Sequence, residues 1–148
     1  MALSAAEEII TTQGYQMLSA RKVAGAIGYT VGTLYLVFDN LDDLILQVNG
    51  RTLDRLHQQI MRDQERCAEA EECLLQLGHS YIQFADSEPH AWKTIFERRL
   101  SDDHEAPEWY REKVARMFAL VEERLSQLPV ERNPCLLYTS DAADDETS

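Results

Sequence analysis

Basic residues, long hydrophobic runs and glycine-rich loops are scarce or missing in this sequence. Its 148 residues include 14 Lys and Arg against 26 Asp and Glu, a formal net charge of −12. Because a nucleic-acid partner requires Lys and Arg to neutralise phosphates, this balance by itself argues against one. No apolar stretch is long enough to cross a bilayer, and the opening stretch MALSAAEEII has no basic region before an apolar one. We therefore expect a cytoplasmic protein without a membrane partner.

Cysteine and histidine give no sign of a metal site or of catalysis. The cysteines Cys67, Cys73 and Cys135 follow no metal-ligand spacing, and their odd number favours reduced thiols in a cytoplasmic protein. No two histidines stand at i, i+4 spacing. No Ser/His/Asp order and no paired carboxylates stand out. The sequence therefore predicts neither an enzyme nor a bound metal or cofactor.

Apolar residues recur at helical spacing almost throughout, and no segment alternates as a β-strand does. The sequence therefore predicts an all-α fold. Capping residues, glycines and prolines divide the pattern into separate helices. The expected helices span residues 2–13, 19–28, 31–38, 41 to beyond 61, 70–85, 89–100 and 107–128.

The last stretch of the chain differs in composition from the rest. After Pro134 the sequence reads CLLYTSDAADDETS, with four acidic residues, no basic ones and no apolar periodicity after Tyr138. This string resembles the in-frame translation of a sequencing adapter, so we expect residues 135–148 to be non-native. The alternative is a natural disordered acidic tail. A native gene that encodes these residues at the genomic locus would contradict the first interpretation.

Residues 18–45, LSARKVAGAIGYTVGTLYLVFDNLDDLI, contain two short predicted helices joined through Gly28. The second helix is too short to be stable unless it packs against its neighbours. Its inward positions are expected to be Leu34 and Phe38, which can pack against Val23, Ala24 and Ile27 of the helix before it. Two such helices joined by a glycine-containing turn have the form of a helix-turn-helix.

A longer string of residues in this region resembles the TetR family of one-component transcriptional regulators. Its members, in order, are Ser19, Val23, Ala24, Gly28, Thr30, Gly32, Thr33, Leu34, Tyr35, Phe38 and Leu44. The resemblance covers residues 3 to about 48. It implies a DNA-binding head of three helices over residues 1–48, with the third helix entering the major groove. It also implies a helical ligand-binding and dimerisation domain over residues 49–134, which we expect to be incomplete.

The resemblance places candidate DNA contacts on both helices of the helix-turn-helix. These are Ser19, Arg21, Lys22, Thr30, Val31, Gly32, Thr33, Tyr35, Leu36 and Val37. Two departures stand out: Leu41 lies where the family often has a lysine, and Leu36 and Val37 lie where polar or aromatic residues are common. Residues 1–48 also carry only two basic residues against five acidic ones. Specificity should then rest more on methyl contacts with thymine, while helix N-termini can still hold phosphates.

The second domain is expected to hold an apolar small-molecule inducer. The candidate cavity residues are His79, Tyr81, Phe84, Trp92, Phe96, Trp109 and Phe118. The implied function is a ligand-responsive repressor of a double-stranded DNA operator. Inducer binding would favour a conformation whose two heads no longer match the spacing of the half-sites.

Two further expectations concern partners. The full-length protein should be a homodimer, whereas a chain that stops near Pro134 should dimerise poorly. The alternative function is a helical protein-interaction module whose helix-turn-helix no longer binds DNA and offers Leu36 and Val37 to a protein. The salt dependence of DNA binding distinguishes the two functions, since a DNA binder loses affinity as salt rises.

Overall fold

The computed structural model describes residues 1–97 and 106–128, and within them the chain is all-α, as predicted. The helices are α1 (Ala2–Gln13), α2 (Ala20–Ile27), α3 (Val31–Val37), α4 (Leu41–Gln64), α5 (Ala70–Ser87), α6 (Pro89–Glu97) and α7 (Glu108–Ser126), with a short 3-10 turn, η1 (Tyr15–Met17), after α1. The predicted continuation of the sixth helix to residue 100 and the tail at 135–148 lie outside the described residues. No helix within the described ranges is long and apolar enough to span a membrane.

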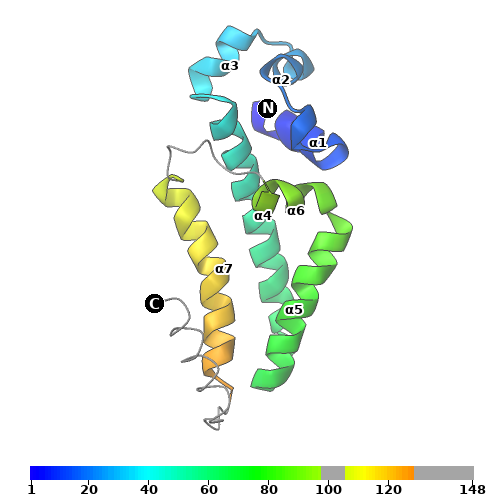
Figure 1. The fold of residues 1–148 in the computed structure, drawn as a ribbon, viewed down its shortest axis with the longest axis vertical. Coiled ribbons are helices and arrows are strands. Elements are labelled where there is room, and N and C mark those ends of the chain that lie inside the picture. The colour runs from blue at the N-terminus through cyan, green and yellow to red at the C-terminus, as the bar shows by residue number, and fades with distance from the viewer. Residues whose placement is uncertain (98–105, 129–148) are drawn as a thin grey trace, which may run out of the picture.

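The three N-terminal helices gather at one end of the molecule, and α4 runs from them along most of its length (Figure 1). We call residues 1–48 the head. Below the head, α5 and α7 flank α4, while α6 packs against α1 (Figure 1). One continuous helix therefore joins the head to the rest of the chain, without a linker between them.

Side-chain caps fix the helix starts that the sequence predicts. The Ser19 hydroxyl accepts a hydrogen bond from the Lys22 backbone N–H at 3.1 Å, and the Thr30 hydroxyl accepts from the Thr33 N–H at 3.2 Å. At the start of α4 the cap is Asn40, whose side-chain oxygen accepts from the Asp43 N–H at 2.7 Å. These caps fix where α2 and α3 begin, and both helices are too short to be stable without packing against their neighbours.

Two separate hydrophobic clusters lie along α4. The first fills the head and consists of Ala6, Ile10, Leu18, Val23, Leu34, Phe38, Leu44, Ile45 and Val48. The second lies between α4, α5 and α7 and consists of Leu53, Leu56, Ile60, Leu77, Phe84 and Met117. Because the apolar face of α4 continues from one cluster to the other, a displacement of α4 changes the packing of both clusters.

Ion pairs also connect the head to the helices below it. Glu7 of α1 pairs with Arg51 at 3.4 Å and with Arg55, both on α4. Arg55 uses its other terminal nitrogen to contact Glu88 at 2.8 Å, where α5 gives way to α6. One acidic side chain of the head is thus paired with basic side chains from outside it, so the head is less acidic in effect than its own residues suggest.

Gly50, in the middle of α4, lies directly against the indole ring of Trp109 at the start of α7. A Cβ atom at residue 50 would come within 2.9 Å of a Trp109 ring carbon. Nearby, the Lys113 ammonium lies 2.6 Å from the Asp54 carboxylate. The missing side chain of Gly50 therefore allows α7 to pack closely on α4.

Replacing Gly50 with alanine, with and without Trp109, should separate the helix preference for alanine from the close contact with the Trp109 ring. Alanine in a helix interior is favoured over glycine by about 0.5–1 kcal/mol, so Gly50→Ala in a Trp109→Ala background should be stabilising by that amount. With Trp109 present, the same change should be neutral or destabilising, because the ring must move. Urea unfolding of the four proteins measures the coupling. Gly78→Ala is the matched control, since a Cβ there meets nothing within 4 Å and should stabilise the protein.

The expectation of reduced thiols is wrong for two of the three cysteines. Cys67 and Cys73 form a disulfide between the end of α4 and the start of α5, with their Cα atoms 5.2 Å apart. The prediction relied on the odd number of cysteines and took no account of the corner that brings these two together. Cys135 lies outside the described residues.

Candidate functional site

Helix α3 presents two faces of opposite character. Leu34 and Phe38 point into the head and are buried, at 3% and 6% exposed, as predicted. At 3.6 residues per turn, Gly32 and Leu36 fall on the opposite side of the helix, with Thr33 and Tyr35 on its flanks. Leu36 is 85% exposed. The outermost side chain of α3 is therefore an aliphatic one, with hydroxyl groups on either side of it.

The Thr33 hydroxyl is held in place by the cap residue of α3, Thr30. Thr30 and Thr33 lie 2.9 Å apart, oxygen to oxygen, and both are exposed. Because this contact fixes the two side chains without burying them, each oxygen keeps bonding capacity for a partner at the start of α3. Val31, next to them, is half-buried.

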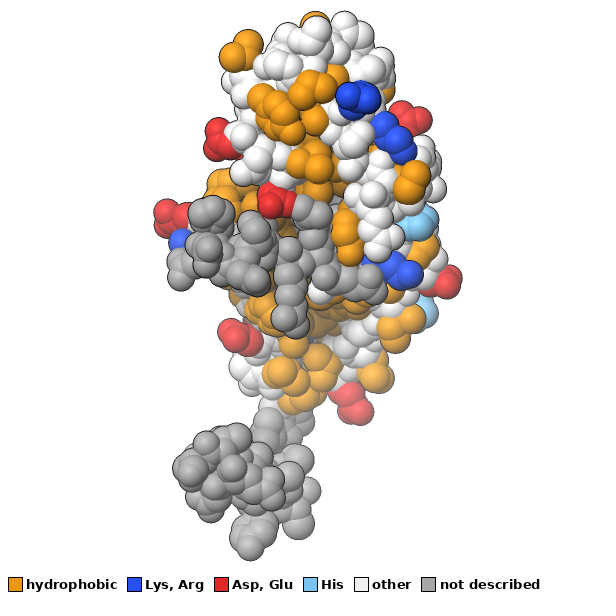
Figure 2. Space-filling view, turned by 45° about the horizontal axis from the view of Figure 1, so that its top comes forward, with side chains coloured by type: hydrophobic (Ala, Val, Ile, Leu, Met, Phe, Trp, Pro, Cys, Tyr) orange, Lys and Arg blue, Asp and Glu red, His pale blue; other side chains and the backbone are white. Residues whose placement is uncertain are grey.

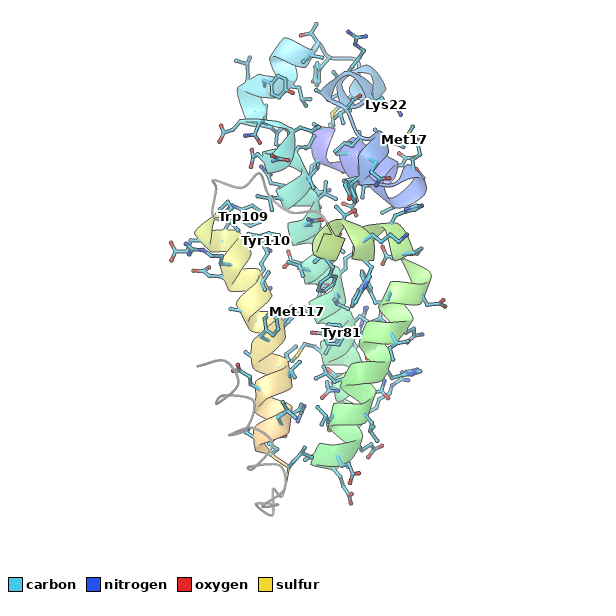
Figure 3. All side chains as sticks on the ribbon, in the orientation of Figure 1. Met17, Lys22, Tyr81, Trp109, Tyr110 and Met117 are labelled. Carbon is cyan, nitrogen blue, oxygen red and sulfur yellow. A yellow bond between two sulfur atoms is a disulfide. The ribbon has the colours of Figure 1, made fainter. Side chains whose placement is uncertain are left out.

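Basic side chains lie beside this surface on α2. Arg21 and Lys22 are both exposed, and Ser19 caps the same helix. Neither cation pairs with a carboxylate among the described residues. Figure 2 shows basic side chains next to hydrophobic ones near the top of the view, at the head end of the molecule, and Lys22 is labelled on α2 in Figure 3. The structure thus brings the predicted residues of α2 and α3 together at one end of the molecule.

Val37 has a different neighbourhood from the other exposed residues of α3. It borders an open groove of about 500 Å³ between the beginning of α1, the end of α2 and α3. The other residues that line the groove are Met1, Ala2, Leu3, Ile27, Tyr29, Thr33, Leu34 and Phe38. Val37 is 73% exposed, so the groove leaves most of its side chain in solvent.

The acidic residues at the start of α4 are partly engaged within the head. The Asp43 carboxylate accepts the backbone N–H of Asp39 at 3.2 Å and the side-chain amide of Gln47 at 3.3 Å. With Glu7 paired to arginines of α4, at least two of the five acidic side chains of the head are held by partners on the protein. The head surface therefore opposes an anionic partner less than its net charge suggests.

A second site lies between α4, α5, α6 and α7, as a cavity of about 280 Å³. The lining residues that the structure describes are all apolar or aromatic: Leu53, Leu56, Tyr81, Trp92, Ile95, Phe96, Val114, Met117, Phe118 and Val121. Figure 3 shows Tyr81 of α5 and Met117 of α7 directed into the space between these helices. Burial raises the pKa of the Tyr81 hydroxyl, so this group is uncharged at neutral pH.

Aromatic rings form one wall of the cavity. The Trp92 ring lies with its centroid 4.5 Å from that of Phe96 and 6.3 Å from that of Tyr81, the latter edge to face. Phe84 packs behind Trp92, at 6.4 Å between centroids, and is buried. The rim is open at Phe96 and Phe118, which are both exposed.

The structure brings four of the seven predicted cavity residues to the cavity: Tyr81, Trp92, Phe96 and Phe118. Phe84 belongs to the buried cluster behind it. His79 is exposed on the outer face of α5, and Trp109 lies on Gly50 at the other end of α7. The aliphatic lining, such as Leu53 and Val114, was not among the predicted residues. Helical periodicity marks it as inward-facing but cannot separate a cavity wall from a packed core.

Comparisons with known proteins agree with this arrangement. Residues 2–48 match the family model described as bacterial regulatory proteins, tetR family. A search of curated proteins by sequence finds no match.

Several solved structures share the fold. The transcriptional regulator FadR from Bacillus subtilis, solved in complex with stearoyl-CoA, has a TM-score of 0.56 and 21% identity over 84% of this chain and 64% of that one. A TetR family transcription regulator from Marinobacter aquaeolei VT8 has a TM-score of 0.56 and 19% identity over 85% and 63%. The fatty acid degradation regulator FadR from Bacillus halodurans has a TM-score of 0.56 and 24% identity over 84% and 67%. The chain thus spans slightly less than two thirds of the first two relatives.

Proposed function

We propose that the protein is a transcriptional regulator that binds a double-stranded DNA operator through α2 and α3, because residues 2–48 match the family model of the tetR family of bacterial regulatory proteins. The observation that carries the proposal is the exposed face of α3, with Thr33, Tyr35 and Leu36 outward and Leu34 anchoring the helix from within. A helix held in this way can enter a major groove without losing its packing.

The chemistry of this face suits a site rich in A·T pairs. Leu36 and Val31 offer methyl groups to the C5-methyl of thymine, and the Thr33 hydroxyl can bond to a base edge or a phosphate. Arg21 and Lys22 on α2 would contact the backbone. With so few cations, non-specific binding should be weak, so discrimination between sequences should depend strongly on the apolar contacts.

Removing the two cations of α2 tests the DNA contact. The DNA is a duplex selected from a random-sequence pool. With Arg21→Ala and Lys22→Ala combined, the negative slope of log K against log salt should become less steep by about 2, one for each lost phosphate contact. Fluorescence anisotropy across a salt series measures it. Arg66→Ala, an exposed cation at the opposite end of α4, is the matched control and should leave the slope unchanged.

A second candidate function is supported by the exposure of Leu36 and Val37, which a protein partner could cover. In that case the helix-turn-helix would be a helical interaction module that no longer binds DNA. Salt separates the two candidates, because an apolar protein contact is strengthened rather than weakened by added salt. Failure to select any duplex, together with salt-resistant binding of a protein, would favour this alternative.

We further propose that the cavity binds an uncharged, apolar small molecule that regulates DNA binding. None of its described lining residues is charged, and it lies on the same helix, α4, whose first turns form part of the head. Its volume is near the lower end of the range for small-molecule sites, about 300–1,000 Å³, so it fits a small ligand or one apolar arm of a larger one. The Bacillus subtilis relative was solved with an acyl-CoA, whose hydrocarbon chain has this character.

Decanol and decanoate, which share a hydrocarbon chain and differ in charge, test the cavity. We expect decanol to change the fluorescence of Trp92 at concentrations at least tenfold below those needed for decanoate, because no described lining residue is a cation that could pair with a carboxylate. The measurement uses Trp109→Phe protein, in which Trp92 is the remaining tryptophan. Val114→Phe should fill the cavity and abolish the response, and Val37→Phe on the head is its control. Equal responses to both probes would contradict the proposal.

We also propose that the full-length protein acts as a homodimer, so that two heads reach half-sites one helical turn of DNA apart. In this arrangement, ligand binding shifts the population toward conformations in which the heads no longer match that spacing. Light scattering on the protein, free and bound to DNA, checks the stoichiometry. One head per duplex at saturation would overturn this part of the proposal.

A further inference from the structure

The disulfide joins the segment after α4 to the beginning of α5. This end of α4 is the one remote from the head (Figure 1). The two sulfur atoms differ in access: Cys73 is 3% exposed, in the first turns of α5, whereas Cys67 is half-buried in the corner that follows α4. We propose that this pair is a reversible oxidation site for hydrogen peroxide, with Cys67 as the attacked thiol and Cys73 as the resolving thiol. The proposal does not depend on DNA binding or on the cavity.

Access and proximity favour this division of roles. Peroxide reaches the Cys67 thiolate, which displaces hydroxide from the peroxide and becomes a sulfenic acid. The Cys73 thiol then attacks the Cys67 sulfur, the S–S bond forms, and water leaves with the proton of the thiol. Overall, two thiols and one peroxide give one disulfide and two waters. Reduction by a dithiol returns both thiols.

Gln64 contacts both cysteines of the corner in addition to the S–S bond. The Gln64 side-chain amide, itself buried, donates a hydrogen bond to the Cys73 carbonyl at 2.9 Å. The Cys67 sulfur lies 3.1 Å from the Gln64 carbonyl oxygen, which can accept a hydrogen bond from the thiol after reduction. Both redox states therefore have their polar groups satisfied, so the pair can cycle without unfolding the corner.

The charges around the pair favour an uncharged oxidant. Residues 63–72 contain one basic residue, Arg66, and five acidic ones: Asp63, Glu65, Glu69, Glu71 and Glu72. The Glu72 carboxylate accepts the Ala68 backbone N–H at 3.5 Å, which holds one negative charge over the loop between the cysteines. Glutathione disulfide is anionic and is repelled by this cluster, whereas hydrogen peroxide is not.

Oxidation should stiffen the beginning of α5. Glu69, which precedes this helix, makes no side-chain capping bond, so the first turn depends on its connection to α4. Cys73 is followed by Leu74 and Leu77, which pack in the cluster around Leu56. The disulfide thus fixes the position of α5, which forms one side of that cluster, relative to α4, which leads to the head.

The test uses the 148-residue chain with Cys135→Ser, in which Cys67 and Cys73 are the remaining cysteines. After reduction with dithiothreitol, both thiols should accept a maleimide under denaturing conditions. Peroxide should abolish this labelling, lower the mass by two hydrogens and form no dimer. It should also raise the melting temperature by an amount on the order of 5 °C. At equal concentration, glutathione disulfide should react at least tenfold more slowly, and Glu69→Gln with Glu72→Gln should narrow that difference.

Single cysteine variants assign the roles. With Cys73→Ser, Cys67 should form a sulfenic acid that dimedone traps, whereas with Cys67→Ser the buried Cys73 should be unreactive in folded protein. The opposite pattern would overturn the assignment. A disulfide that dithiothreitol reduces only after denaturation would be a permanent structural link, and a reduced pair that peroxide does not close would not be an oxidation site. Either result would overturn the proposal.

Discussion

Replacing Leu44 with alanine is expected to destabilise the head by about 2–5 kcal/mol. Leu44 lies in the first turn of α4, is 1% exposed and belongs to the cluster that holds Ile10 of α1 and Phe38 behind α3. A cavity at this point removes contacts from three helices at once. Since domains of this size are stable by only about 5–15 kcal/mol, this loss is a large fraction of the stability, and DNA binding should weaken as the unfolded fraction of the head rises.

Leu56→Ala is the matched comparison, because Leu56 is equally buried but belongs to the second cluster. It should also be destabilising, yet it should change the Trp92 fluorescence and the response to decanol more than it changes DNA binding. Circular dichroism and Trp92 fluorescence in urea, together with anisotropy on DNA, distinguish the two variants. If both variants lost DNA binding and the ligand response at the same urea concentration, the two clusters would unfold as one unit.

Most helix ends could be predicted because each has a local cause. Ser19, Thr30 and Asn40 cap the helices they precede, and Gly28 ends α2 in the left-handed conformation that glycine favours. These signals act within four residues along the chain, so they can be recognised without knowing the fold. The same holds for the inward face of α3, where Leu34 and Phe38 are four residues apart.

Features that depend on contacts between distant segments could not be predicted in this way. The Cys67–Cys73 bond requires the chain to turn a corner between α4 and α5, and the contact of Trp109 with Gly50 joins residues 59 positions apart. His79 is a different case. It is two residues from Leu77 and two from Tyr81, both inward, so helical periodicity alone places it on the outer face of α5.

The acidic composition shows a further limit of counting charges. Glu7 counts against DNA binding in the sequence, yet Arg51 and Arg55 hold it where α1 meets α4. What matters for a partner is the charge on the surface that faces it, where Arg21 and Lys22 are exposed beside α3. The position of each charge is a property of the fold.

Placing a carboxylate at the outermost position of α3 should have the largest effect on DNA binding. Leu36→Glu leaves the core untouched, because the side chain is 85% exposed. In a DNA complex, however, it would bring a negative charge against the phosphates and remove a methyl contact. Juxtaposed like charges cost several kcal/mol, so affinity for the selected duplex should fall by about 100-fold or more. Anisotropy titration at fixed salt measures the loss.

Leu75→Glu makes the same chemical change at a comparable position, since Leu75 is 71% exposed on the outer face of α5. It adds the same charge to the whole protein, so any general repulsion of DNA appears in both variants, and only the difference reports a contact at α3. Leu36→Ala should weaken binding by much less, because it removes methyl groups without adding charge. If Leu36→Glu and Leu75→Glu bound the duplex equally well, α3 would not be the helix that enters the groove, and the exposed Leu36 would require another partner.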